Sequence, residues 1–284
     1  MTAEDHLRSG DVDAALAALQ TDIRAKPQDA KLRIFLFQLL CVMGQWQRAV
    51  TQVKLAAELD ASAIPMAQTY REAIICELMR DKVFAGEKEP LMFGEPTDWM
   101  ARLIEALKLT ARGEGEAAMA MRNEAFEAAP AASGMLNGEP FEWIADADMR
   151  LGPVLEVILN GRYFWVPFTA ISQLRIEEPS DLRDLVWTPC EITFANEGEM
   201  VGLIPTRYPG TAEAAPELRL SRTTEWRDLG AETWAGLGQR LLATDAGDTG
   251  LLELRQLNVT QPEGAATGEG GGEGETPAEA GEHG

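Results

Sequence analysis

The sequence predicts an α+β protein, in which a helical first half is followed by a small β-rich domain. Residues 1–132 are rich in Ala, Leu, Glu and Gln and lack the alternation of strands, which predicts consecutive amphipathic helices. In residues 133–260, short β-branched and aromatic runs are bounded by Gly, Pro or Asn, which is typical of strands joined by tight turns. Residues 261–284 contain Glu and Gly but no Lys or Arg, so we predict a disordered tail there.

The helical half carries a repeated pattern in which an alanine follows a glycine by five residues. The pairs are Gly10 with Ala15, Gly44 with Ala49, and Gly113 with Ala118. The first two pairs lie 34 residues apart, and the third is offset by one residue from a multiple of that period. The glycine permits a tight turn between paired helices, and the alanine lets those helices approach closely. Because 34 residues is the period of the tetratricopeptide repeat, we predict a tetratricopeptide-like region over residues 1–132.

Apolar residues inside the second unit recur at spacings of three and four residues. They are Leu32, Phe35, Leu36, Leu39, Leu40 and Met43. This pattern predicts one buried stripe between stacked helices. The alternative is that some of these residues line a groove that accepts a partner helix.

The β-rich domain contains a strong hairpin signal. Asn160–Gly161 lies between two apolar runs, and this dipeptide favours a two-residue turn between antiparallel strands. Several short strands with tight turns predict a small barrel-like or sandwich domain. We expect Trp143, Trp165 and Trp187 to pack in its core, because large aromatic side chains dominate small cores.

The charge of the chain narrows the possible partners. A formal net charge of −21 repels phosphate, so nucleic acid is not an expected partner, and an anionic membrane surface is disfavoured as well. The first residues lack the basic and apolar regions of a secretory signal, and no apolar run approaches the length of a spanning helix. Three widely separated cysteines fit free thiols in a reducing cytoplasm. We therefore expect a cytoplasmic protein with no membrane insertion.

Catalytic motifs are absent from the sequence. Its two histidines are His6 and His283, so a Ser–His or Cys–His nucleophile system is not expected. No Cys–x–x–Cys or His–x–x–x–His spacing predicts zinc, and the Gly-rich runs lack the lysine of a phosphate loop. The sequence therefore predicts no metal and no cofactor.

Asp146 and Asp148 are the residues to which chemistry could be assigned. Two carboxylates can bind a hard cation or act as a general acid–base pair. The alternative, which we favour, is that one acid caps a turn while the other pairs with Arg150 or Arg162. Acids two residues apart point to opposite faces of a strand, and in a tight loop the same spacing fits capping equally well.

A second charged cluster surrounds Arg183. Asp181 and Asp184 lie on either side of it in the stretch "EEPSDLRDLVW". Acids near the start of a short helix accept hydrogen bonds from its free backbone N–H groups. We interpret these residues as a local ion-pair and cap cluster.

Three stretches in order, "EWIADADMRLGPVLEVILNGRYFWVPF", "IEEPSDLRDLVWTPCEITF" and "GLIPTRYPG", resemble the ImpE/TagJ family over about residues 135–210. The residues that carry the resemblance are Trp143, Asp146, Asp148, Arg150, Gly152, Pro153, Arg183, Asp184, Trp187, Arg207, Tyr208, Pro209 and Gly210. The resemblance implies a non-enzymatic accessory protein of the bacterial type VI secretion system. It further implies that the protein binds a helical segment of the small subunit of the contractile sheath, and that it connects the sheath to the AAA+ ATPase that recycles it.

Two other functions remain open at this point. The first is a carboxylate- or metal-dependent enzyme that uses Asp146 and Asp148. The second is a general helical-repeat scaffold of an unrelated complex, because repeat scaffolds offer extended binding surfaces to many partners.

Overall fold

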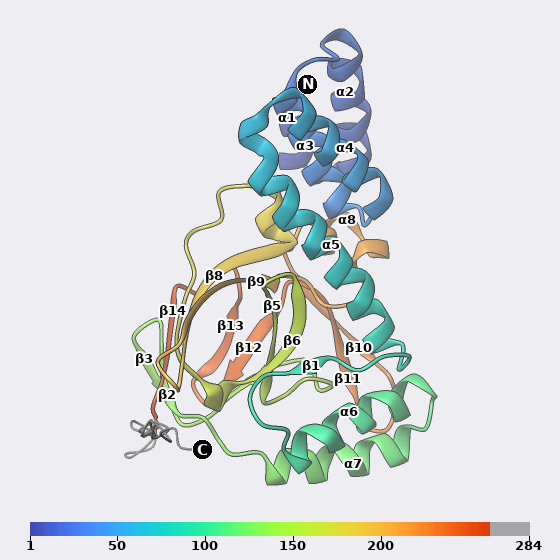
Figure 1. Ribbon diagram of the computed structural model, residues 1–284. Helices are drawn as coiled ribbons and strands as arrows, with labels where there is room; N and C mark the ends of the chain where they lie inside the picture. Colours follow the sequence, from blue (N-terminus) through green and yellow to red (C-terminus); the bar gives the residue numbers. More distant parts are fainter. Residues whose placement is uncertain (262–284) are drawn as a thin grey trace, which may run out of the picture.

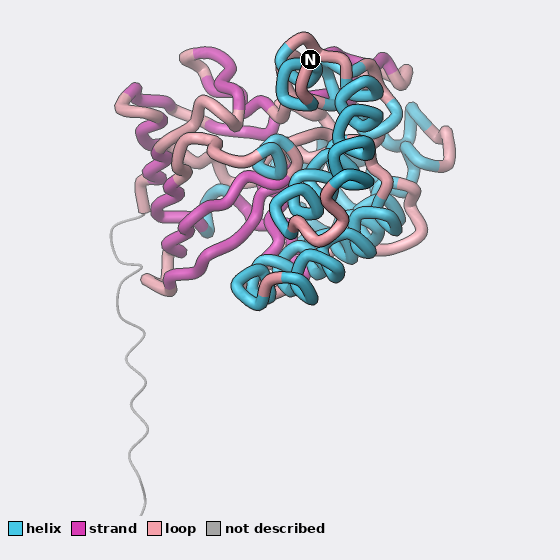
Figure 2. The backbone as a smooth tube through the Cα atoms, turned by 90° about the horizontal axis from the view of Figure 1, so that it is seen from above, coloured by secondary structure: helices cyan, strands magenta, loops and turns pink. Residues whose placement is uncertain are grey.

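The structure is a computed structural model that describes residues 1–261, and it confirms the α+β class. Helices form the amino-terminal part, and the strands follow them (Figure 1). Seen from above, the helices gather on one side of the strands (Figure 2). The predicted tail, apart from Gln261, lies outside the described residues.

The amino-terminal half folds into helical hairpins and one long helix. The elements are α1 (Ala3–Arg8), α2 (Val12–Ala25), α3 (Ala30–Val42), α4 (Trp46–Leu59), the short 3₁₀ helix η1 (Ala61–Ala63), α5 (Ile64–Phe84), α6 (Asp98–Ala111) and α7 (Gly115–Ala128). The turns within α1–α2, α3–α4 and α6–α7 contain Gly10, Gly44 and Gly113, with φ angles of +85°, +66° and +78°. These turns require φ values that glycine adopts without a steric penalty. The turn glycines thus lie where the repeat predicts them, but assignment to the tetratricopeptide class is not confirmed.

The apolar stripe of α3 lies in the core. Leu36, Leu39 and Leu40 are buried, and the other stripe residues pack against the same apolar cluster. This arrangement favours the interpretation of the stripe as packing between helices.

The carboxy-terminal half is rich in strands. They are β1 (Leu91–Met92), β2 (Gly134–Leu136), β3 (Glu139–Phe141), β4 (Ile144–Asp146), β5 (Val154–Leu159), β6 (Arg162–Pro167), β7 (Ile171–Arg175), β8 (Trp187–Phe194), β9 (Glu199–Pro205), β10 (Thr224–Asp228), β11 (Trp234–Gly238), β12 (Leu241–Thr244), β13 (Gly247–Gly250) and β14 (Gln256–Val259). Short helical turns connect them: η2 (Phe168–Ala170), η3 (Leu182–Leu185), η4 (Thr211–Glu213) and α8 (Pro216–Arg219).

The largest sheet formed within residues 1–261 has nine strands in the order β1-β6-β5-β9-β8-β7-β14-β2-β3. A second sheet has the order β13-β12-β4, and β10 pairs with β11 as a separate hairpin. In the described part of the chain the two end strands, β1 and β3, do not pair with each other, so the expectation of a barrel-like domain is not confirmed. Both end strands are very short and offer little backbone for closing the sheet.

The predicted hairpin at Asn160–Gly161 is confirmed. It joins β5 to β6 with Leu159 opposite Arg162, and both turn residues have positive φ angles, +48° and +69°. Two successive positive φ values define the type of turn that matches the twist of antiparallel strands. One face of this hairpin, which carries Tyr163 and Trp165 of β6, packs against α5.

The nine-stranded sheet divides the core into two clusters. Tyr163 and Trp165 on one face belong to the cluster that also contains the helices, whereas Leu155 and Val157 on the other face belong to a cluster of strand residues. β1, which belongs to the first half of the sequence, pairs in parallel with β6.

No helix within residues 1–261 combines the length and the apolar character needed to cross a membrane.

Candidate functional site

A buried network of charges lies where α5 crosses the sheet, and Glu156 of β5 is at its centre. Arg80 of α5 donates to both carboxylate oxygens of Glu156, from Nε to Oε1 at 2.6 Å and from Nη2 to Oε2 at 2.8 Å. Arg240 donates to Oε2, and the hydroxyl of Tyr163 donates to Oε1. Glu156 therefore holds together one helix and two segments of the β-rich half.

Arg240 extends this network to Asp146 of β4. Its Nη1 donates to Asp146 Oδ2, and its Nε donates to the carbonyl of Pro205 at 2.9 Å. Asp146 Oδ1 accepts hydrogen bonds from the backbone N–H of Asp148 at 2.9 Å and from the hydroxyl of Tyr208 at 3.1 Å. As we favoured, one acid of this pair caps the turn, and that acid is Asp146. Its ion pair with Arg240 was not predicted.

Asp148 is the acid that forms the expected ion pair, and of the two arginines considered its partner is Arg150. Its Oδ1 accepts from the backbone N–H and the Nε of Arg150, each at 2.9 Å, and its Oδ2 accepts from Nη2 at 2.5 Å. The backbone N–H of Gly236 donates to the same Oδ2 at 3.0 Å. The side chains of Asp146 and Asp148 have no solvent exposure, and all four oxygens accept hydrogen bonds from this chain. Neither carboxylate therefore presents a free oxygen to a substrate.

Burial and charge act in opposite directions on these acids. Burial raises the pKa of Glu156, but Arg80 and Arg240 outweigh it and hold the pKa at about 2. Burial also raises the pKa of Asp146, and there Arg240 only partly compensates, so the pKa is about 6. The two carboxylates of one network therefore have very different pKa values, about 2 for Glu156 and about 6 for Asp146.

The raised pKa of Asp146 predicts a dependence of stability on pH. The unfolded chain releases this proton near the ordinary value of 3.8, whereas the folded protein holds it up to about 6. The folded state therefore binds more protons between these values, and the contribution of Asp146 to stability increases as pH falls through 6. Relative to Asp146→Asn, which cannot titrate, the wild type should gain about 1 kcal/mol in free energy of unfolding between pH 7 and pH 5.

Urea denaturation at both pH values measures this gain. Asp13→Asn, at an exposed position of α2, is the control for changes elsewhere in the chain. The quantity compared is the free energy of unfolding of the wild type minus that of Asp146→Asn. If this difference is not larger at pH 5 than at pH 7, the raised pKa of Asp146 is contradicted.

The "RYPG" stretch joins the helices to the sheet. Arg207 donates to backbone carbonyls at the end of α3, to Val42 at 2.8 Å and Cys41 at 3.2 Å. A cation at a helix carboxyl terminus satisfies free carbonyls and interacts favourably with the helix dipole. Tyr208 reaches Asp146, Pro209 is buried, and Gly210 turns the chain with a φ of +84°.

The stretch around Arg183 forms the predicted local cluster. Arg183 pairs with Asp181, and Asp184 Oδ2 accepts from the backbone N–H groups of Ser180 and Asp181, each at 2.9 Å. Trp187 follows and donates from Nε1 to Glu77 Oε1 of α5 at 3.0 Å. This short segment thus continues the contact between the helices and the sheet.

Gly152 and Pro153 lie in the turn before β5. A Cβ built on Gly152, whose φ is +55°, would lie 2.4 Å from the ring of Phe126 in α7. The carbonyl of Pro153 accepts from the N–H of Phe168 at 3.1 Å.

Trp165 and Trp187 are fully buried as predicted, but the prediction for Trp143 is wrong, because it is 43% exposed. Trp143 precedes β4, and the next residue, Ile144, occupies the inward position instead.

Sequence reasoning assigned no role to Arg80, Glu156 or Arg240 in a shared network. One signal for Glu156 was present, because it interrupts the apolar run "VLEVIL" of a strand that is buried at every position. A lone acid in such a strand requires a cation. The sequence carries no comparable signal for the arginines that pair with Glu156, because positions 80 and 240 are far from it along the chain.

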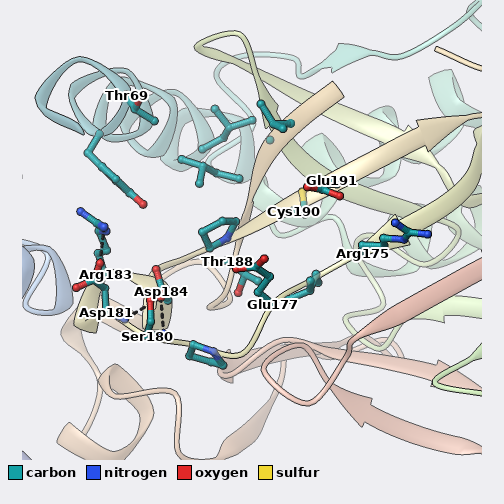
Figure 3. A pocket seen from close by; sticks show the side chains of 18 of the residues that line it. Thr69, Arg175, Glu177, Ser180, Asp181, Arg183, Asp184, Thr188, Cys190 and Glu191 are labelled. Atoms are coloured by element: carbon teal, nitrogen blue, oxygen red, sulfur yellow. Dashed lines mark hydrogen bonds and ion pairs between the residues drawn. The ribbon is translucent and has the colours of Figure 1, made fainter. Parts of the chain in front are cut away.

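A cleft of about 1050 Å³ lies between α5, strands β8 and β9, and the segment of residues 175–184 (Figure 3). Thr69 of α5 lies on one side, and the segment from Arg175 to Asp184 lies on the other. Cys190 and Glu191 of β8 lie between them. Among residues 1–261, no group of three or more His, Cys, Asp or Glu side chains is placed to hold a metal ion.

The fold and the buried network define an α+β protein whose motif residues join a helical layer to a sheet. Comparison with known proteins assigns the family. The family model described as ImpE protein matches residues 138–258. The type VI secretion system accessory component TagJ of Pseudomonas aeruginosa is 56% identical over 259 residues, which is 91% of this chain and 91% of TagJ.

A solved structure shares the fold of this chain. The crystal structure of protein VPA1032 from Vibrio parahaemolyticus has a TM-score of 0.84 and 26% sequence identity, covering 92% of this chain and 98% of that protein. The chain belongs to the ImpE family, and the resemblance detected in its sequence motifs is confirmed.

Proposed function

We propose that this chain is an accessory component of a bacterial type VI secretion system and acts as a non-catalytic adaptor in the cytoplasm. The observation that carries the proposal is the 56% identity to TagJ over 91% of both proteins. Its partner would be a helical segment of the small subunit of the contractile sheath. Through that contact the protein would connect the sheath to the AAA+ ATPase that recycles it.

The state of the acidic residues supports a role in binding over a role in catalysis. Asp146, Asp148 and Glu156 are buried, and their oxygens accept hydrogen bonds from arginine, tyrosine or backbone groups. A catalytic carboxylate must come within hydrogen-bond reach of the proton that it transfers. We infer that the family-motif residues act by holding the helices against the sheet.

The arrangement of the helices supports an adaptor as well. The hairpins α1–α2 and α3–α4 lie next to each other at the amino-terminal end (Figure 1). We propose that residues 1–132 are a tetratricopeptide-like scaffold and that residues 133–260 are a β-rich domain of the ImpE type. Two differently built parts would let one chain contact two partners, the sheath and the ATPase.

A binding measurement tests the proposal. A fluorescent peptide with the sequence of the first helix of the small sheath subunit should bind the full-length protein with a Kd of about 1 μM or tighter, about −8 kcal/mol. A peptide of the same composition in scrambled order is the control. Folded protein that does not bind the peptide at a concentration of about 100 μM, far above that Kd, would contradict the proposal.

A further inference from the structure

One edge of β10 is free in the described part of the chain. β10 forms a separate hairpin with β11 (Figure 1), and it pairs with no other strand among residues 1–261. Its five residues run from Thr224 to Asp228, and all of them except Thr224 are exposed. A strand edge of this kind presents unpaired N–H and C=O groups that can bond to another strand.

The contacts of β11 show which backbone groups of β10 point to this edge. The N–H of Gly236 donates to Asp148 Oδ2 at 3.0 Å, so it points away from β10. Gly236 lies opposite Trp226, and this pair is therefore one of the pairs that exchange no hydrogen bonds. Because the two kinds of pair alternate along an antiparallel ladder, the N–H and C=O groups of Trp226, Thr224 and Asp228 point outward, to the free edge.

The sequence of β10 is complementary to itself when two copies pair in antiparallel fashion about Trp226. In this register Trp226 lies opposite Trp226 of the second copy, and their outward N–H and C=O groups can exchange hydrogen bonds. Glu225 lies opposite Arg227 of the second copy, and Arg227 lies opposite Glu225. Side chains of opposite charge that lie directly opposite each other stabilise a strand pair, whereas like charges destabilise it. The charges on this edge therefore favour pairing with a second copy.

Exposed tryptophans accompany the free edge. The ring of Trp226 packs on Tyr208 with the ring centroids 5.8 Å apart, yet Trp226 remains 38% exposed. Trp234 lies opposite Asp228, so it shares a face of the hairpin with Trp226, and it is 46% exposed. Tryptophan is enriched where proteins associate. Pairing about Trp226 would bring the Trp226 side chains of the two copies together.

We propose that two copies of this chain associate through β10, so that their hairpins form one continuous antiparallel sheet with a twofold axis at Trp226. The complementarity of Glu225 and Arg227 identifies the second copy as the occupant of the edge. Short strands make a small interface, and small interfaces give weak complexes, so we expect a Kd of about 100 μM. Each copy has a net charge of −21, but at 0.15 M salt the Debye length is about 8 Å, so charges far from the interface are screened.

Analytical ultracentrifugation of the full-length protein at 0.15 M salt tests the proposal. Over about 10–500 μM, a range that spans the expected Kd, the mass should rise from 31.0 kDa for one chain toward twice that value. Glu225→Arg and Arg227→Glu each place like charges opposite each other, so each variant alone should weaken dimerisation at least about tenfold. The control is Glu58→Arg at an exposed position of α4, which makes the same change in net charge as Glu225→Arg and should change the Kd less than about threefold.

A mixture of the two single variants gives a readout that a merely structural effect would not produce. In a heterodimer, the new arginine at position 225 of one copy would lie opposite the new glutamate at position 227 of the other. The original Arg227 and Glu225 would also lie opposite each other. An equimolar mixture of Glu225→Arg and Arg227→Glu should therefore dimerise about as tightly as the wild type, although neither variant does so alone.

The backbone of the edge is tested at position 226. Trp226→Pro removes both the ring and the N–H that points outward, whereas Trp226→Ala removes only the ring. Proline is tolerated at an edge position whose N–H faces solvent, so both variants should fold, and circular dichroism checks this. The proline variant should dimerise more weakly than the alanine variant.

Three outcomes would overturn the proposal. The first is a wild type that remains monomeric at about 500 μM, well above the expected Kd. The second is a wild-type dimer that Glu225→Arg and Arg227→Glu leave unchanged, which would show that another surface forms it. The third is a mixture of folded single variants that does not recover dimerisation. None of these outcomes bears on the adaptor function, because the dimer does not rest on it.

Discussion

Replacing Arg240 with methionine is expected to lower the free energy of unfolding by about 3–5 kcal/mol. Arg240 has no solvent exposure and is shared by Asp146 and Glu156. Methionine fills much of the same space but leaves Asp146 without its ion-pair partner and Glu156 with Arg80 alone. Breaking a buried ion pair from one side costs more than the pair contributes, because an uncompensated charge remains in a medium of low dielectric constant.

Urea denaturation at pH 7, followed by circular dichroism, measures this loss. Arg227→Met is the matched control, because Arg227 is exposed on β10 and its loss should change stability by less than about 0.5 kcal/mol. A loss below about 1 kcal/mol for Arg240→Met would show that water or rearrangement compensates the two acids.

Replacing Trp187 with alanine is expected to cost about 3–5 kcal/mol in free energy of unfolding. The indole is fully buried, and its ring centroid lies 5.8 Å from the rings of both Trp46 and Tyr70. Truncation removes these contacts, opens a cavity and takes away the N–H that donates to Glu77. The helices α4 and α5 would lose the aromatic contact that Trp46 and Tyr70 make with β8.

Trp143→Ala is the control for Trp187→Ala. Trp143 is partly exposed, so its truncation should cost clearly less, about 1 kcal/mol or below. Equal losses for the two variants in urea denaturation would contradict the packing roles that the structure assigns to them.

Local features of the fold were predictable from sequence because they depend on neighbouring residues. The Asn160–Gly161 hairpin and the glycine turns between paired helices follow from φ angles that few residues adopt easily. An ion pair of Asp146 or Asp148 with Arg150 or Arg162 was predicted for the same reason, and the pair that forms, Asp148 with Arg150, spans only two residues. Trp143 was misplaced because the start of β4 at Ile144 decides which side chain points inward, and sequence boundaries do not fix that.

The buried network was not predictable in the same way. Its ion pairs join Arg80, Asp146, Glu156 and Arg240, and their partners are separated by 76 to 94 residues. Which arginine reaches which acid depends on how β5 and β4 lie beneath α5, and this arrangement arises only when the whole chain packs. The cleft was missed for a similar reason, because its sides come from segments near residues 70, 160, 180 and 200.

The shared apolar cluster beneath α5 has a consequence for dividing this protein into pieces. A fragment ending at residue 132 would carry Arg80 without its carboxylate and would leave Ile74, Cys76 and Val83 without Tyr163, Trp165 and Leu203, with which they share a core. A fragment starting at residue 133 would carry Glu156 without Arg80 and would expose to solvent the apolar face of the sheet that the helices cover. We therefore expect each fragment to aggregate when produced alone, and the two to be recovered in soluble form only when produced together in the same cell.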